Sequence, residues 1–200
     1  RDRQESPGPI TFNEVHYHPV ADGTPEWLEL HNPLVMDLDL SGWRLDGGIQ
    51  WTFPRGTVIR AGGFVVVAAD PDALEDATGF SEALGPFDGG LSNAGERIEL
   101  RNNTGRRIDT LHYGERAPWP VAPDGSGATL AKRGPDLASD VAEHWSGSGD
   151  IGGTPGVDNG LFREATTERV ELVAEDAFWT VDVSGGTGEE GWAGIGFDDA

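Results

Sequence analysis

The sequence predicts an all-β fold, a sandwich of about eight or nine short strands with one short helical insertion. Segments that alternate apolar and polar residues recur at hairpin spacing up to about residue 160. The 30 glycines and 13 prolines gather largely in the turn-like stretches between these segments. Helical segments do not alternate regularly with the strands, so the pattern disfavours a parallel α/β fold.

The first two strands are expected at residues 10–17 and 26–31, each followed closely by a proline. Successive side chains of a strand point to opposite faces of its sheet. In the first strand, alternation therefore places Ile10, Phe12 and Glu14 on one face and Thr11, Asn13 and Val15 on the other. In the second strand, it places Trp27, Glu29 and His31 on one face and Leu28 and Leu30 on the other.

A hairpin follows in the next part of the chain. Residues 38–46 and 50–53 flank the turn sequence Asp46-Gly47-Gly48, which is a strong hairpin signal. Trp43 and Trp51 lie on either side of this turn. We expect them to lie in the core or to form a cross-strand pair.

The helical insertion is expected within residues 70–85. Residues 57–59 predict a short strand, and residues 64–69 are a continuous apolar run typical of a buried central strand. Asp70 can then cap a helix, and Pro71 suits its first position. One or two short helical turns should follow.

The remaining strands predict a second hairpin and a looped exit. Residues 97–101 and 107–113 should pair across a turn, and residues 128–132 should form another short strand. The loop after it contains Trp145 and ends in the glycine-rich residues 152–156.

We expect three parts along the chain. Residues 1–9 form a linker, residues 10–160 form one domain, and residues 161–200 form a C-terminal extension. Two strand-like segments in the extension suggest either the truncated start of a second β domain or an extra edge of the sandwich. The chain begins at Arg1 without methionine, which suits a mature or excised piece of a longer protein with neighbouring domains.

Composition excludes several classes of partner. The formal net charge is −21, from 35 acidic and 14 basic residues, and such a field repels the phosphates of nucleic acids. No stretch approaches the roughly 20 apolar residues of a transmembrane helix. The absence of cysteine excludes disulfides and cysteine zinc sites. Acidity favours solubility and hard cations such as calcium.

Two histidines form a candidate zinc site. His16 and His18 are two residues apart on a predicted strand, so they share a face, and His31 or Glu29 could complete a ligand set. The alternative is that both histidines occupy ordinary variable positions of the opening motif FNEVHYHP, since the spacing of a zinc-protease helix is absent.

The acidic residues of the strands have two interpretations. Asn13 and Glu14 can hydrogen-bond to neighbouring backbone, and Glu29 can pair with an arginine. Alternatively, Glu14, Glu26 and Glu29 could line a cation site.

Four carboxylates form a candidate calcium site. Asp70, Asp72, Glu75 and Asp76 lie within seven residues, and calcium binds several oxygen ligands in acidic loops. The alternative is that they cap the helix and interact with its dipole, since the spacing of an EF-hand is absent.

Tryptophans are candidate binding residues. Trp119 lies between two prolines and is expected at a loop surface, and Trp27 and Trp145 are expected to be partly exposed. Exposed aromatic side chains can stack on sugars or anchor a protein partner, whereas core packing is the other explanation.

Five motifs follow one another within residues 12–114. They are FNEVHYHP at 12–19, EWLELHNP at 26–33, DLSGWRLDGG at 39–48, TFPRGTVIRAGGFVVVAAD at 52–70 and LSNAGERIELRNNTGRRIDTLHYG at 91–114. In this order the motifs resemble those of the lamin tail domain family. The glycine-rich exit GGTPGVDNG also resembles that of bacterial members.

The resemblance implies an immunoglobulin-like sandwich without catalytic residues, used in bacteria as a module of secreted or cell-surface proteins. We therefore expect an extracellular interaction or spacer module without cofactor, binding a protein or polysaccharide. The alternatives are a metal-dependent hydrolase that uses His16, His18 and nearby acids, and a calcium-stabilised structural domain. Residues 172–200 resemble the first strands of a galactose-binding-like jelly roll.

Overall fold

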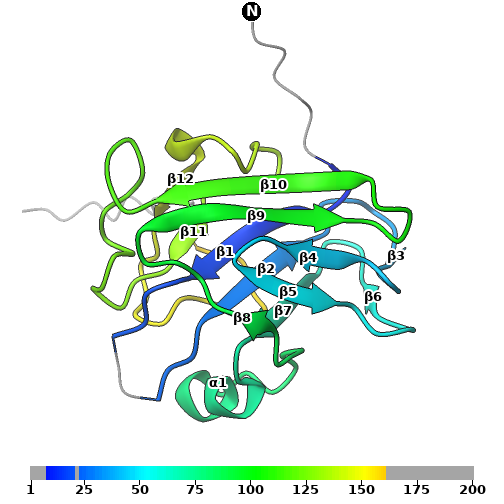
Figure 1. Cartoon of the computed structure of the whole chain (residues 1–200), viewed down its shortest axis with the longest axis horizontal. Helices are drawn as coiled ribbons and strands as arrows, with labels where there is room; N and C mark the ends of the chain where they lie inside the picture. Colours follow the sequence, from blue (N-terminus) through cyan, green and yellow to red (C-terminus); the bar gives the residue numbers. More distant parts are fainter. Residues whose placement is uncertain (1–7, 21–22, 161–200) are drawn as a thin grey trace, which may run out of the picture. The chain divides into compact units, whose positions relative to one another are not determined.

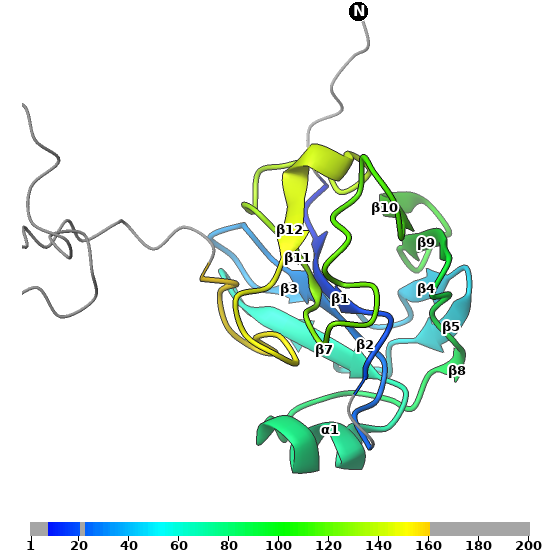
Figure 2. The ribbon, with the colours of Figure 1, turned by 90° about the vertical axis from the view of Figure 1, so that its left-hand side faces the viewer.

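The protein is described from a computed structural model, which covers residues 8–20 and 23–160. Two five-stranded antiparallel sheets face each other across one core (Figures 1 and 2). The first has the order β12 (Trp145–Gly147), β11 (Leu130–Lys132), β1 (Thr11–His16), β2 (Trp27–His31), β7 (Phe64–Ala68). The second has the order β10 (Arg107–Gly114), β9 (Gly95–Arg101), β4 (Arg44–Asp46), β5 (Ile49–Thr52), β8 (Asp88–Gly89).

Smaller elements complete the described part of the chain. β3 (Leu38–Asp39) pairs with β6 (Val58–Ile59), α1 covers Pro71–Thr78, and a 3-10 turn, η1, covers Ala142–His144. The predicted all-β sandwich with one short helical insertion is therefore confirmed. The structure adds β8 and β12, which are edge strands of two and three residues, too short to show an alternating pattern.

A bulge in β1 changes which of its side chains face the core. The register shifts between Phe12, opposite Leu30, and Glu14, opposite Glu29. Phe12 and Val15 both join the core between the sheets, and Glu14 faces away from it. The expectation that Val15 faces away from Phe12 is wrong, because a bulge inserts one residue and reverses the alternation after it.

β2 keeps the predicted alternation. Leu28 and Leu30 lie in the main core, whereas Trp27 belongs to a second apolar cluster on the outer face of the first sheet. This cluster also contains Val66 and Ala68 of β7 and Leu74 of α1. The helix therefore covers part of the outer face of the first sheet (Figure 2).

The two hairpin tryptophans are not a cross-strand pair. Trp51 lies opposite Leu45, and the Trp43 carbonyl oxygen accepts a hydrogen bond from the Phe53 N–H at 2.9 Å. Both indole rings nevertheless contact the core: Trp43 is buried and Trp51 is half-buried against it. The core prediction is confirmed and the pairing prediction is wrong.

α1 begins where its sequence predicts, and the structure adds its end. The Asp70 side chain accepts a hydrogen bond from the Ala73 N–H at 3.1 Å, and Pro71 occupies the first turn. Gly79, with a φ of 78°, ends the helix in the left-handed conformation, and its N–H donates to the Glu75 carbonyl oxygen.

Replacing Asp70 with alanine is expected to lower the free energy of unfolding by about 1 kcal/mol, the usual contribution of an N-cap. Urea unfolding followed by tryptophan fluorescence measures the change. Asp76→Ala is the matched control, because Asp76 is exposed on the same helix and is not the cap. An equal loss in both variants would contradict the capping role of Asp70.

Candidate functional site

Two carboxylates face each other on the outer face of the first sheet. Glu14 of β1 lies directly opposite Glu29 of β2, and both side chains are fully buried. We refer to Glu14 and Glu29 as the carboxylate pair. Their burial requires hydrogen-bond donors, since an unpaired charge in a protein interior costs several kcal/mol.

The donors come largely from residues 151–159, named here the exit segment. The Thr154 N–H and hydroxyl each donate to Glu14 Oε2 at 3.1 Å, and the Gly156 N–H donates to Glu29 Oε2 at 2.6 Å. Asn159 Nδ2 donates to the Asn13 carbonyl oxygen at 3.1 Å. The exit segment therefore covers the carboxylate pair.

Asn13 of β1 and Thr129, the residue before β11, supply the remaining donors. Thr129 Oγ1 donates to Glu14 Oε1, and Asn13 Nδ2 donates to Glu29 Oε1 at 2.7 Å. The expected hydrogen bond from backbone to Glu14 is present, through Thr154. The expected pairing of Glu29 with an arginine is not found among residues 8–20 and 23–160, where Glu29 accepts hydrogen bonds from an amide and a backbone N–H group.

The environment of the pair favours protonation. Burial raises the pKa of Glu14 from 4.5 to about 7, against the lowering effect of the Thr129 and Thr154 hydrogen bonds. Burial raises the pKa of Glu29 to about 8, against the Gly156 and Asn13 hydrogen bonds, and the Glu14 charge adds to the rise. The pair therefore takes up protons near neutral pH.

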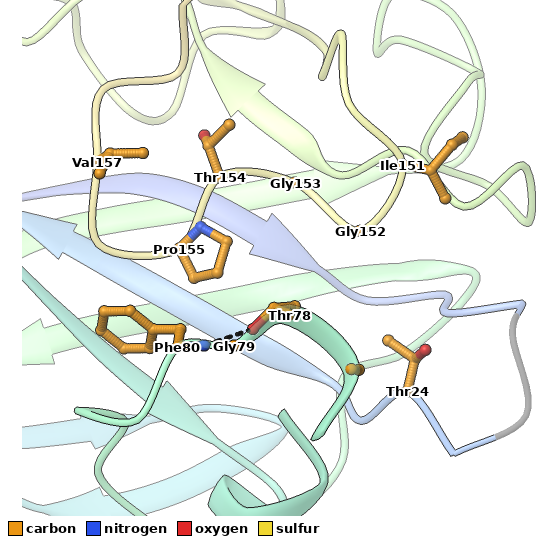
Figure 3. A pocket seen from close by; sticks show the side chains of 11 residues that line it. Thr24, Thr78, Gly79, Phe80, Ile151, Gly152, Gly153, Thr154, Pro155 and Val157 are labelled. Atoms are coloured by element: carbon orange, nitrogen blue, oxygen red, sulfur yellow. Dashed lines mark hydrogen bonds between the residues drawn. The ribbon is translucent and has the colours of Figure 1, made fainter. Parts of the chain in front are cut away.

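An open cleft of about 610 Å³ adjoins the exit segment (Figure 3). One wall is the end of α1 with Gly79 and Phe80, and the other is formed by residues 151–155 and Val157. Phe80 and Pro155 lie opposite each other in it. Ile151 and Val157 are 75% and 56% exposed, so the cleft offers aliphatic surface to solvent.

In the described part of the chain, the zinc candidates His16 and His18 do not form a site with a third ligand. His16 is buried beside Trp27, and burial lowers its pKa to about 4. His18 Nδ1 contacts Asp124 Oδ1 at 2.7 Å, and His31 stacks on Phe64. Within residues 8–20 and 23–160, no group of three or more metal-ligand side chains comes together. The zinc site stays a prediction.

The calcium candidates lie along α1. Asp70 is engaged as the helix cap, and Asp72, Glu75 and Asp76 are exposed. They too form no ligand group of three in the part of the chain that the structure describes. Calcium binding stays a prediction, and the capping alternative has direct support for Asp70.

The exposure expected for two tryptophans is wrong. Trp27 is fully buried under the exit segment and Trp145 is 1% exposed in the main core. Trp119 is half-buried, and its ring lies 6.5 Å from that of Trp145. Trp145 Nε1 donates to the Ser139 carbonyl oxygen at 2.8 Å, which allows the indole to be buried. Only part of Trp119 is accessible to a partner.

The chain's only lysine is part of a buried network that the sequence did not suggest. Lys132 Nζ donates to Ser139 Oγ at 2.9 Å, and Ser139 Oγ donates to Asp109 Oδ2 at 2.6 Å. Burial lowers the pKa of Lys132 to about 8 and raises that of Asp109. Asp109 also accepts the Phe12 N–H, so the network joins β1, β10, β11 and the loop after β11.

Ser139→Ala is expected to lower the free energy of unfolding by about 1–3 kcal/mol, because it leaves buried polar partners without their shared hydroxyl. Urea unfolding measures the loss. Ser146→Ala, on β12, is the control, and it should change stability by well under 1 kcal/mol. A Ser139→Ala variant as stable as this control would show that the network does not hold these elements together.

The described helices include none long and apolar enough to cross a membrane. Residues 161–200, with their resemblance to a jelly roll, lie outside the described residues. Internal contacts divide the chain into two units, Arg1–Arg163 and Glu164–Ala200, and the described residues belong to the first.

Comparison with known proteins identifies the family of this fold. The model of a family described as Lamin Tail Domain matches residues 3–115, more than half of the 200 residues. A search of curated proteins gave no match. The matched residues contain strands β1 to β10, and the exit segment lies beyond them. The family is a non-enzymatic, immunoglobulin-like module. The chain therefore belongs to the lamin tail domain family.

Proposed function

We propose that this lamin tail domain is a non-catalytic interaction module of a larger secreted or cell-surface bacterial protein, and that it contacts a protein or polysaccharide partner. The cleft between α1 and the exit segment carries the proposal. It has exposed aliphatic side chains at Ile151 and Val157 on a wall held in place by hydrogen bonds to buried carboxylates.

The burial of the polar groups favours a structural role for them over a catalytic one. Glu14 and Glu29 are fully buried, and their oxygens accept hydrogen bonds from the fold. Ser139 is 2% exposed, and its hydroxyl proton is directed to Asp109 rather than to the Lys132 amine. A nucleophile or base must reach its substrate within hydrogen-bond distance, and these groups are covered.

Binding of the purified chain to glycan and peptide arrays tests the proposal. We expect saturable binding to one class of ligand, with loss of binding in the Ile151→Ser/Val157→Ser variant. The matched control is Val35→Ser/Met36→Ser, which removes similarly exposed aliphatic surface in another loop, where the two side chains are 95% and 58% exposed. Binding to no ligand, or equal loss in both variants, would overturn the interaction role.

A separate measurement tests the zinc and calcium hypotheses. Metal analysis and thermal unfolding with and without calcium should show neither stoichiometric zinc nor a calcium-dependent rise in melting temperature if the domain works as proposed. A ligand that binds only the folded state raises that temperature. Stoichiometric zinc would favour the hydrolase alternative, and a rise with calcium would favour a calcium-stabilised spacer.

A further inference from the structure

We infer that the outer face of the second sheet docks an acidic polysaccharide, a sugar chain that carries carboxylate or sulfate groups. The inference goes beyond the proposed function, since it concerns a surface other than the cleft. It comes from one arrangement: Arg44 of β4, Arg101 of β9 and Arg107 of β10 lie directly opposite one another across three adjacent strands (Figure 1). We refer to these three residues as the arginine row.

The arginine row lies on the outer face of its sheet. The residues of β9 that alternate with its core residues are Arg97, Glu99 and Arg101, so their side chains point outward. Residues directly opposite each other in a sheet share a face, which places Arg44 and Arg107 on either side of Arg101. Four of the chain's 14 basic residues therefore gather on one face of an otherwise acidic protein.

The carboxylates of this face do not cover the arginines. Glu99 pairs with Arg97 at 2.6 Å and also with Arg101, and Arg107 Nη1 lies 3.9 Å from Glu99 Oε1. The Glu99 side chain is only 14% exposed, whereas those of Arg97 and Arg107 are 52% and 47% exposed. Asp46 Oδ2 lies 3.6 Å from Arg101 Nε. Several guanidinium groups thus share one covered carboxylate, and a ligand meets mainly the cations.

Arg44 adds a charge that is not compensated. It is exposed and belongs to no ion pair among residues 8–20 and 23–160. Like charges directly opposite each other destabilise a sheet, and arginine stays charged at any ordinary pH. An anion bound across the arginine row would relieve this repulsion. The guanidinium group is also suited to oxyanions, which it binds through two parallel hydrogen bonds.

The other side chains of this face favour a sugar chain over a protein partner. Among the described residues, no exposed large apolar side chain lies on β4, β5, β9 or β10. Protein partners usually depend on apolar or aromatic anchors in such a surface. Thr52 of β5, directly opposite Arg44, and Gln50, two residues before it, are exposed on the same face. Their hydroxyl and amide groups can exchange hydrogen bonds with sugar hydroxyls.

The net charge of −21 selects among anionic ligands. Exposed charges are largely screened beyond about 8 Å at physiological ionic strength, so a ligand on this face responds mainly to the nearest arginines. Duplex nucleic acid carries one charge per roughly 1.7 Å of its axis and brings many charges against the acidic remainder of the surface. A sugar chain with one acidic group per unit brings fewer, and charge complementarity therefore favours it.

Fluorescence anisotropy tests the inference on the full chain. The labelled probes are polygalacturonate and dextran sulfate, with uncharged dextran, polyglutamate and duplex DNA as counterparts. We expect saturable binding of at least one acidic polysaccharide that weakens with salt, and binding of the counterparts that is about tenfold weaker or more. The Arg44→Gln/Arg107→Gln variant should weaken binding of the polysaccharide about tenfold or more.

The matched control is Arg60→Gln/Arg116→Gln, which removes two exposed arginines from loops. It should keep binding within about twofold of the unmodified chain. An equal loss in this control would reduce the effect to general attraction and overturn the inference. So would the absence of saturable binding to either acidic polysaccharide. Equal or tighter binding of dextran, polyglutamate or DNA would overturn the choice of an acidic sugar chain.

The outcomes for this face and for the cleft are distinguishable. Loss of acidic-glycan binding in Arg44→Gln/Arg107→Gln alone supports the inference and leaves the cleft unsupported. Loss in Ile151→Ser/Val157→Ser alone supports the cleft and overturns the inference.

Thermal unfolding supplies a second readout. The bound polysaccharide should raise the melting temperature of the unmodified chain, but not that of Arg44→Gln/Arg107→Gln. Without ligand, that variant should melt close to the unmodified chain, because both side chains are exposed. Should it unfold early, Arg44→Gln alone is used, and unchanged binding in this folded variant would overturn the inference.

Discussion

Raising the pH from 6.5 to 8 is expected to lower the free energy of unfolding by roughly 2 kcal/mol, because the carboxylate pair is buried. The folded-state pKa values, about 7 for Glu14 and about 8 for Glu29, lie above the ordinary value of 4.5. The folded state therefore holds protons that the unfolded state has already released. The resulting stability is complete below pH 4.5 and is lost as the pH rises through 7 and 8.

Other buried groups make this pH window the informative one. His16 has a folded pKa of about 4, below its ordinary 6.5, so its contribution rises with pH up to 6.5 and opposes that of the carboxylates there. Lys132, lowered from 10.5 to about 8, begins to contribute in the same opposing direction only near the upper end of the window. Between pH 6.5 and 8, the carboxylate pair therefore dominates the change of unfolding free energy with pH.

Urea unfolding at a series of pH values, followed by tryptophan fluorescence, measures this dependence. The Glu14→Gln/Glu29→Gln variant is the control, because an amide is similar in shape to the protonated acid but does not titrate. Subtracting its profile from that of the unmodified chain removes the contributions of His16 and Lys132. A difference profile that is flat or rises between pH 6.5 and 8 would show that the pair does not titrate as inferred.

Gly153→Ala is expected to lower the free energy of unfolding by about 3 kcal/mol or more. Its φ is +79°, and an added Cβ would lie 2.5 Å from Glu14 Oε1, 2.6 Å from Thr129 Cγ2 and 2.9 Å from Trp27 Cζ2. These neighbours are buried and cannot all move away. The substitution should therefore lift the exit segment from the carboxylate pair, which urea or thermal unfolding detects.

Gly152→Ala is the matched control for this prediction. Gly152 has nearly the same φ, +83°, but no atom lies within 4 Å of an added Cβ. Gly152→Ala should lower the free energy of unfolding by about 1–2 kcal/mol through backbone strain alone. The difference between the two variants measures the close approach of the exit segment to the sheet. Equal costs would mean that the segment does not pack on the pair as described.

The sequence anticipated the elements formed by neighbouring residues. Period-two alternation placed β2 correctly, with Trp27 and Glu29 opposite to Leu28 and Leu30. Asp70 and Pro71 predicted the start of α1, because N-caps depend on contacts within one turn. These features are readable because their physical causes lie within a few residues of each other.

The candidate site was anticipated only in its parts. Glu14 and Glu29 are conspicuous as acids within otherwise apolar strands, and the glycine-rich exit stood out as a turn sequence. The proximity of the exit segment to the carboxylate pair could not be predicted from the sequence, since Thr154 and Glu14 are separated by 140 positions along the chain. The cleft was missed altogether, because α1 and the exit segment contribute walls that carry no shared sequence signal.

Local patterns in the sequence were thus sufficient for the all-β class, the position of α1 and, through ordered motifs, the lamin tail family. The folded chain alone settles that β1 bulges after Phe12, that the sole lysine is buried, and that the exit segment covers two opposed carboxylates. The reason is physical: periodicity and caps act between neighbours, whereas register, burial and pKa depend on which distant segments exclude water from the same place.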